Sequence, residues 1–240
     1  MKFPSPSSPR RPGSLSVVSA WAGVVLVLCS FPLRAQTGTR IHRYDPAEIN
    51  DSASLSPADR ARSTMDRYAS CLVDYNEPKV RRFLSMFPDK NAEDFGSRLA
   101  SSECLGSGEM SFSATIFRGS LYKALYRKEF GKSGVAINGA SIDYAAEAKD
   151  FPAEVAGPYI ALRQFAECVV VKDVPQSREI TLAAAGSQRE KAGFAALSPL
   201  FGPCLQQGVN VTFSKQVLGG LIAETLYRLS TYPERAAGSH

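Results

Sequence analysis

Histidine and tryptophan are nearly absent from this sequence of 240 residues, which contains two histidines and one tryptophan. His42 lies in a polar N-terminal stretch and His240 is the last residue. A Ser–His or Cys–His mechanism needs an imidazole that the fold holds in place, and so does a His-ligated metal. The scarcity of histidine argues against these mechanisms, and we predict no catalytic residue, no metal site and no cofactor.

A basic stripe is also lacking, although the formal net charge is +5. The first 35 residues contain four basic side chains and no acidic one. Without them, Lys plus Arg falls from 28 to 24 while Asp plus Glu stays at 23, so the net charge is about +1. Proteins that bind nucleic acid carry clustered basic residues. We therefore expect no nucleic-acid partner.

The first 35 residues have the pattern of a secretory signal peptide. A basic start precedes an apolar stretch from Val17 to Leu28, and Ala35 offers a cleavage site. The alternative is an uncleaved membrane anchor, because residues 15–33 have about the minimum spanning length, although a proline and several serines weaken that interpretation. We expect a periplasmic or secreted protein without a transmembrane segment after cleavage, with a membrane-tethered form as the alternative.

Cysteine is sparse, and the number of cysteines becomes even once Cys29 is removed with the signal peptide. The remaining four are Cys71, Cys104, Cys168 and Cys204. An even number in an exported protein predicts disulfide bonds. Buried free thiols are one alternative. A four-cysteine zinc site is another, but zinc sites usually bring cysteines in close pairs, whereas these four are scattered singly.

One stretch of the sequence occurs twice at identical internal spacing. The first copy is Phe112-Ser113, Gly119 and Leu125-Tyr126-Arg127, and the second is Phe213-Ser214, Gly220 and Leu226-Tyr227-Arg228, at an offset of 101. An apolar stripe recurs at an offset of 97, first as Met65, Tyr68, Ala69 and Leu72, then as Leu162, Phe165, Ala166 and Val169. These matches predict a duplication of roughly 70 residues.

The duplication also predicts the disulfide pairing. Each copy has one cysteine on its first helix and one before its last helix. Pairing Cys71 with Cys104 and Cys168 with Cys204 gives both copies the same geometry. Loops of this size should stabilise the fold by roughly 3–4 kcal/mol each in the chain-entropy model.

The predicted fold is all-α, with two tandem, similar four-helix units that each contain one disulfide. We divide the chain into a signal peptide (1–35), a flexible lead-in (36–56), unit 1 (57–131), a connector (132–156), unit 2 (157–232) and a tail (233–240). In unit 1, Ser56 and Ser113 are expected to cap helices, and Pro78 to end one helix and start a short one over residues 79–86. Asn138-Gly139 predicts a small β-hairpin in the connector.

Several motifs that carry chemistry elsewhere have structural explanations here. Ser120 and Lys123 have the S-x-x-K spacing, but the companion motifs are missing, so we interpret them as part of a helix face. Gly119 and Gly220 predict a close helix crossing. Arg127 and Arg228 are the candidate ligand anchors, although each could instead cap a helix or form a salt bridge. The candidate carboxylates, which we expect to be solvated, are Glu103, Glu109, Glu147 and Glu154.

The functional hypothesis that follows is an exported, non-enzymatic interaction module of the cell envelope or periplasm, which binds an envelope protein or a cell-wall component. One alternative is a small hydrolase with two carboxylates facing each other across a cleft, about 5–10 Å apart. Another is a carrier of a small ligand, with a pocket between the two units.

Overall fold

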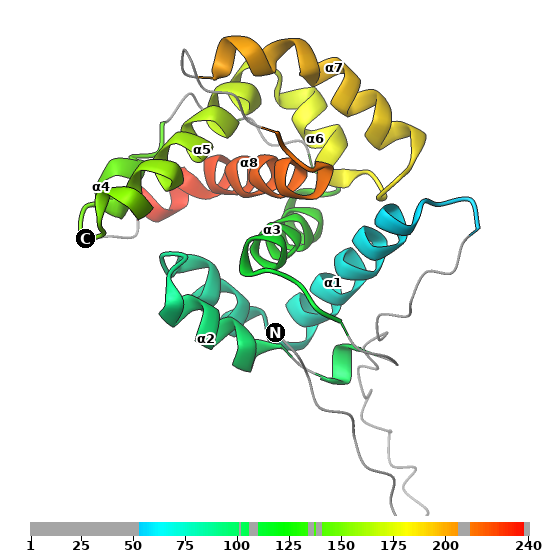
Figure 1. The fold of residues 1–240 in the computed structure, drawn as a ribbon, viewed down its shortest axis with the longest axis horizontal. Coiled ribbons are helices and arrows are strands. Elements are labelled where there is room, and N and C mark those ends of the chain that lie inside the picture. Colours follow the sequence, from blue (N-terminus) through cyan, green and yellow to red (C-terminus); the bar gives the residue numbers. More distant parts are fainter. Residues whose placement is uncertain are drawn as a thin grey trace, which may run out of the picture. The chain divides into compact units, whose positions relative to one another are not determined.

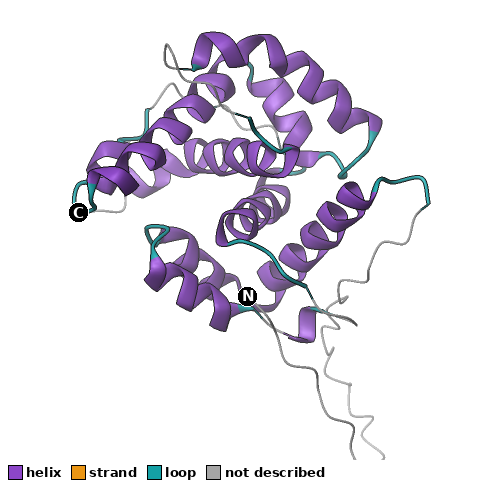
Figure 2. Cartoon of the chain, viewed as in Figure 1, coloured by secondary structure: helices purple, strands orange, loops and turns teal. Residues whose placement is uncertain are grey.

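Helices make up the described part of the chain. The computed structural model describes residues 53–100, 102–105, 110–133, 137, 141–205 and 212–237, with side chains described as far as residue 231. Its elements are α1 (Pro57–Ser85), α2 (Lys90–Leu99), the short 3-10 helix η1 (Ser102–Cys104), α3 (Ala114–Phe130), α4 (Tyr144–Ala148), α5 (Ala153–Lys172), α6 (Val174–Leu182), α7 (Gln188–Cys204) and α8 (Lys215–Ala237). Figure 2 shows no strand in these ranges, so the predicted all-α fold is confirmed. Within the same ranges, no helix is both long enough and apolar enough to cross a membrane.

Serine side chains cap the helices where the sequence predicted them. The backbone N–H of Asp59 donates to the Ser56 hydroxyl at 3.1 Å, and that of Ile116 donates to Ser113 at 3.4 Å. Ser214 accepts in the same way from Val217 at 3.2 Å. Each cap satisfies an N–H group that the helix itself leaves without a partner.

The break predicted in the first helix is present, whereas the fifth helix differs in detail from the prediction. Within α1 two helical segments meet at a kink, where Asn76 has non-helical backbone angles (φ −152°, ψ 63°). The Asn76 side chain accepts from the backbone N–H of Lys79 at 3.3 Å. Proline disturbs the turn that precedes it, so the first segment ends before Pro78 and a short second one follows it. The connector contains the short helix α4, and α5 already begins at Ala153. The predicted hairpin around Asn138-Gly139 lies outside the described residues.

The centre of the fold is the pair of helices α3 and α8. α3 packs against α8 and α1, while α8 also packs against α5 and α6 (Figure 1). Phe117, Leu121 and Leu125 of α3 are completely buried, and so is Ile222 of α8. These apolar faces of α3 and α8, the last helix of each predicted unit and called the closing helices below, form the core.

The two central helices approach each other at a pair of glycines. A Cβ atom added to Gly119 would lie 2.6 Å from the Cα of Gly220, and one added to Gly220 would lie 2.9 Å from the Cα of Gly119. Any larger residue would force the two backbones apart. The close crossing predicted from the sequence is present, and the two glycines are partners in it.

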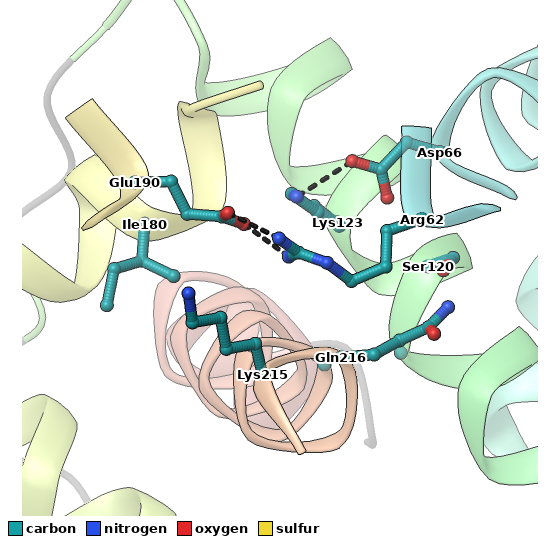
Figure 3. Close-up of a pocket in the computed structure, with 11 residues that line it drawn as sticks. Arg62, Asp66, Ser120, Lys123, Ile180, Glu190, Lys215 and Gln216 are labelled. Atoms are coloured by element: carbon teal, nitrogen blue, oxygen red, sulfur yellow. Dashed lines mark hydrogen bonds and ion pairs between the residues drawn. The ribbon is translucent and has the colours of Figure 1, made fainter. Parts of the chain in front are cut away.

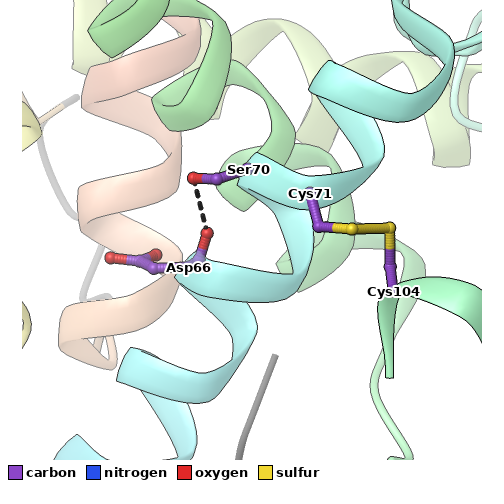
Figure 4. Close-up of a disulfide and its surroundings, with 4 residues drawn as sticks. All are labelled: Asp66, Ser70, Cys71 and Cys104. Atoms are coloured by element: carbon purple, nitrogen blue, oxygen red, sulfur yellow. Dashed lines mark hydrogen bonds between the residues drawn. A yellow bond between two sulfur atoms is a disulfide. The ribbon is translucent and has the colours of Figure 1, made fainter. Parts of the chain in front are cut away.

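Both disulfides have the predicted partners. Cys71 is bonded to Cys104 with a Cα–Cα distance of 5.6 Å, and Cys168 to Cys204 with 5.7 Å. Figure 4 shows that Cys71 points from α1 toward Cys104, while Asp66 points to the other side of the helix. The first disulfide thus joins α1 to η1 and leaves the opposite face of α1 for contacts with α3.

One contact that the sequence did not predict also recurs at the offset of 97. A Cβ atom on Gly96 would lie 2.8 Å from the ring of Phe83, and one on Gly193 would lie 2.7 Å from the side chain of Ile180. Both members of the second pair follow those of the first by 97 positions. The division into two duplicated units nevertheless stays a prediction, because these are matches between single contacts.

Candidate functional site

The two arginines proposed as ligand anchors both bind other parts of the protein. Arg127 donates to the carbonyl oxygens of Thr181 at 3.0 Å and Ala183 at 2.7 Å, which lie at the C-terminal end of α6. Arg228 pairs with Glu147 and lies over the ring of Tyr144 at 5.1 Å. Their guanidinium groups join helices that are far apart in the sequence.

Each arginine also belongs to a charged cluster, which is partly buried around Asp66 and buried around Glu224. Asp66 accepts from Lys123 at 2.7 Å and from Arg127 at 3.4 Å. In the other cluster, Glu224 accepts from Arg163 at 2.9 Å and forms an ion pair with Arg228 at 3.5 Å. Burial by itself would raise the pKa of Glu224, but the nearby positive charges outweigh it and lower that pKa. Glu224 is therefore ionised at neutral pH.

A small polar pocket adjoins the glycine crossing (Figure 3). Its cavity of about 20 Å³ has room for a single water molecule. Arg62 crosses it and binds both carboxylate oxygens of Glu190, at 2.6 and 2.7 Å. Lys215 extends toward this pair from the start of α8. The pocket is too small for an organic ligand, and its most buried charges already face opposite charges.

Ser120 and Lys123, the residues with S-x-x-K spacing, both line this pocket. The Lys123 amino group donates to Asp66 at 2.7 Å. Burial lowers the pKa of Lys123, and the carboxylate of Asp66 acts in the opposite direction. A lysine that is protonated in an ion pair has no lone pair with which to take a proton from a serine. The contact supports a structural role for Lys123.

A larger groove opens where α1, α3 and α8 meet. Its volume is about 520 Å³, within the range of small-ligand pockets. Apolar and aromatic side chains line it together with a few polar ones; they are Leu84, Leu125, Tyr122, Tyr227, Thr231, Ser85, Glu129, Arg81 and Arg82. Because α1 and α8 come from opposite halves of the chain, the groove exists only when both halves are folded.

The polar groups on one side of the groove form a connected network. Arg81 donates to the Tyr227 hydroxyl at 2.6 Å and to Glu129 at 2.6 Å, and Tyr227 donates to Glu129 at 3.1 Å. Burial raises the pKa of Tyr227 to about 12, so its hydroxyl stays protonated. Across the groove, Tyr122 donates to the Leu84 carbonyl at 3.1 Å. These contacts fix the two tyrosine rings, whose centroids are 5.8 Å apart.

Arg82 carries a positive charge at this groove that no salt bridge among the described residues balances. Its guanidinium lies 5.4 Å from the centre of the Phe95 ring. Among the described residues it forms no salt bridge, whereas Arg81 has both Glu77 and Glu129 as partners. The groove therefore combines apolar walls, hydroxyl groups and one exposed cation, Arg82, that has no salt bridge among the described residues. Such a site suits a ligand with an apolar body and a negatively charged group.

Of the carboxylates singled out in the sequence, the three that the structure describes lie outside this groove. Glu147 binds Arg228 and the Tyr159 hydroxyl, and Glu103 and Glu154 are exposed. Glu109 lies outside the described residues. Glu129 is the single carboxylate among the described residues that line the groove. The facing carboxyl pair that a glycoside-type hydrolase requires is thus not formed by these lining residues.

Sequence reasoning did not single out the residues of the groove. Tyr227 is part of the duplicated stretch, and its contact with Arg81 joins residues 146 positions apart. A pattern within one helix carries no information about such a contact. The recurrence of both residues at matching places in the two copies, as Arg178 and Tyr126, was the one available signal.

Fold and site together define the class of this protein: an all-helical protein with two disulfides and a groove at the junction of its central helices. No family model, no curated protein and no solved structure matches the chain.

Proposed function

We propose that this protein is an exported interaction module that binds a partner through the groove between α1, α3 and α8. The observation that carries the proposal is the groove itself, with its fixed tyrosine rings, apolar walls and exposed Arg82. The signal-peptide pattern and the two disulfides support export, because disulfides persist in oxidising compartments. An envelope protein or a cell-wall component with a peptide part is the class of partner that we infer.

The chemistry of the groove narrows the inferred partner further. An apolar or aromatic side chain fits against Leu84 and the tyrosine rings, while a carboxylate can reach Arg82. A peptide segment that presents both groups close together meets these requirements. The alternative, a carrier of a small ligand, would use the same groove with Arg82, in place of Arg127 or Arg228, at its mouth.

The proposal is tested by selecting phage-displayed random peptides on the oxidised protein and measuring their affinity by titration calorimetry. Enriched peptides should contain an apolar side chain near an acidic group. Arg82→Glu should weaken their binding by about tenfold or more, which corresponds to about 1.4 kcal/mol. Ser85→Trp, which fills the groove from an exposed position, should abolish binding.

Arg67→Glu is the matched control for this experiment. Arg67 is exposed on the same helix, α1, but does not line the groove. The Arg67→Glu substitution makes the same change of charge as Arg82→Glu and should leave peptide binding unaltered. Peptides whose affinity is equally insensitive to Arg82→Glu and Ser85→Trp would contradict the proposal. A small acidic, apolar compound that binds where no peptide does would favour the carrier.

A further inference from the structure

Two ion pairs, one partly buried and one buried, occupy matching places in the predicted repeat, and their charges are reversed. Asp66 on α1 faces Lys123 on α3, with 2.7 Å between the charged atoms. Arg163 on α5 faces Glu224 on α8, with 2.9 Å. Arg163 follows Asp66 by 97 positions and Glu224 follows Lys123 by 101, which are the offsets of the repeat. The acid is on the first helix in one half and on the closing helix in the other.

An arginine present in both copies joins whichever member of the pair is acidic. Arg127 contacts Asp66 at 3.4 Å, across to the first helix. Arg228, its equivalent at an offset of 101, contacts Glu224 at 3.5 Å on its own helix. The arginine therefore keeps its sign in both copies while the pair exchanges signs.

The two closing helices otherwise resemble each other closely. Both present apolar residues at the same spacing, Phe117, Leu121 and Leu125 in α3 and Leu218, Ile222 and Leu226 in α8. They also meet in the middle of the fold at Gly119 and Gly220. The first helices of the two halves are α1 and α5. Apolar packing alone therefore determines poorly which of α3 and α8 packs on which of them.

We propose that the reversed charges direct each closing helix to its own first helix during folding. If α3 packed on α5, Lys123 would face Arg163, and if α8 packed on α1, Glu224 would face Asp66. Burying like charges against each other is strongly unfavourable. The native arrangement is the one in which both pairs are attractive. This proposal rests on the predicted equivalence of the two halves and is independent of the proposed function.

Oxidative refolding of the reduced, unfolded chain tests the proposal, with disulfide mapping as the readout. The double variant D66K/K123E gives both halves the same order of charges, a base on the first helix and an acid on the closing helix. Crossed pairing then becomes attractive as well. Crossed disulfides, Cys71–Cys204 and Cys104–Cys168, should increase by about fivefold or more over the wild type, the factor that about 1 kcal/mol gives. The mirror variant R163E/E224R should behave alike.

The quadruple variant D66K/K123E/R163E/E224R separates charge order from local damage. It carries every substitution of both double variants, yet its two halves again differ in charge order. Crossed disulfides should return to about the wild-type level. The proposal is overturned if both double variants refold with the wild-type pairing. It is equally overturned if the quadruple variant crosses as much as the double variants or fails to regain its native disulfides.

Discussion

Gly119 and Gly220 face each other so closely that a Cβ atom on Gly119 would lie 2.6 Å from the Cα of Gly220. The contact is between two backbones, which cannot rotate away as side chains do. We therefore predict that Gly220→Ala destabilises the protein by about 1–3 kcal/mol, the usual cost of overpacking. Urea unfolding followed by circular dichroism measures the change.

Gly219→Ala is the control for this prediction. Gly219 neighbours Gly220 in α8, and a Cβ atom there would make an ordinary contact of 3.6 Å with Phe194. Since alanine favours a helix over glycine by about 1 kcal/mol, this variant should be neutral or more stable. Equal destabilisation by both substitutions would contradict the assignment of the crossing to Gly220.

The buried pair of Arg163 and Glu224 predicts a loss of stability in acid. Burial raises the pKa of Glu224, but Arg163, Arg118 and Arg228 together lower it below its usual value. A carboxyl with a lowered pKa in the folded state stabilises the fold above its unfolded-state pKa. That stabilisation is lost as the pH falls through the folded-state pKa. The free energy of unfolding should therefore decrease from about pH 5 downward.

Glu224→Gln should remove part of this pH dependence. At neutral pH it leaves Arg163 without its carboxylate and should cost about 3 kcal/mol or more, as for other broken buried pairs. Urea unfolding between pH 3 and pH 7 measures both effects. Asp94→Asn, at an exposed site on α2, should change the stability by less than about 0.5 kcal/mol. An unchanged slope in Glu224→Gln would show that other carboxylates account for the acid sensitivity.

Local patterns predicted a large part of this fold. The caps at Ser56 and Ser113 and the helix break near Pro78 depend on residues within a few positions of each other. Cysteine positions in the two copies were enough to predict the pairing of Cys71 with Cys104. In each case the information lies within one helix or in the comparison of two similar segments.

The candidate site could not be predicted in the same way. The groove needs Arg81 from α1 and Tyr227 from α8, and their contact depends on how the central helices cross. The partners of Arg127 are backbone carbonyls on α6, which every sequence contains. The reversed charges of Asp66 and Arg163 were visible at matching positions, but their meaning depends on burial and on partners that only the fold supplies.

Export can be tested through the single tryptophan, Trp21. Cleavage after Ala35 removes it, so the exported protein should show tyrosine fluorescence without indole emission. Protein recovered from the medium or the periplasm and sequenced from its N-terminus should begin at Gln36. Unprocessed protein is the control and should show indole emission. Indole emission from the exported form would instead support the membrane-tethered alternative.

The two disulfides should differ in their resistance to reduction. Cys104 is completely buried and Cys71 is 5 % exposed, whereas Cys168 and Cys204 are both partly exposed. Thiol–disulfide exchange requires access of a thiolate to a sulfur atom. A brief treatment with dithiothreitol, followed by alkylation and peptide mass mapping, should label Cys168 and Cys204 first. In urea, where the fold no longer protects either bond, the difference should disappear. Labelling of Cys71 and Cys104 at the same rate in the folded protein would mean that local opening, and not burial, governs their reduction.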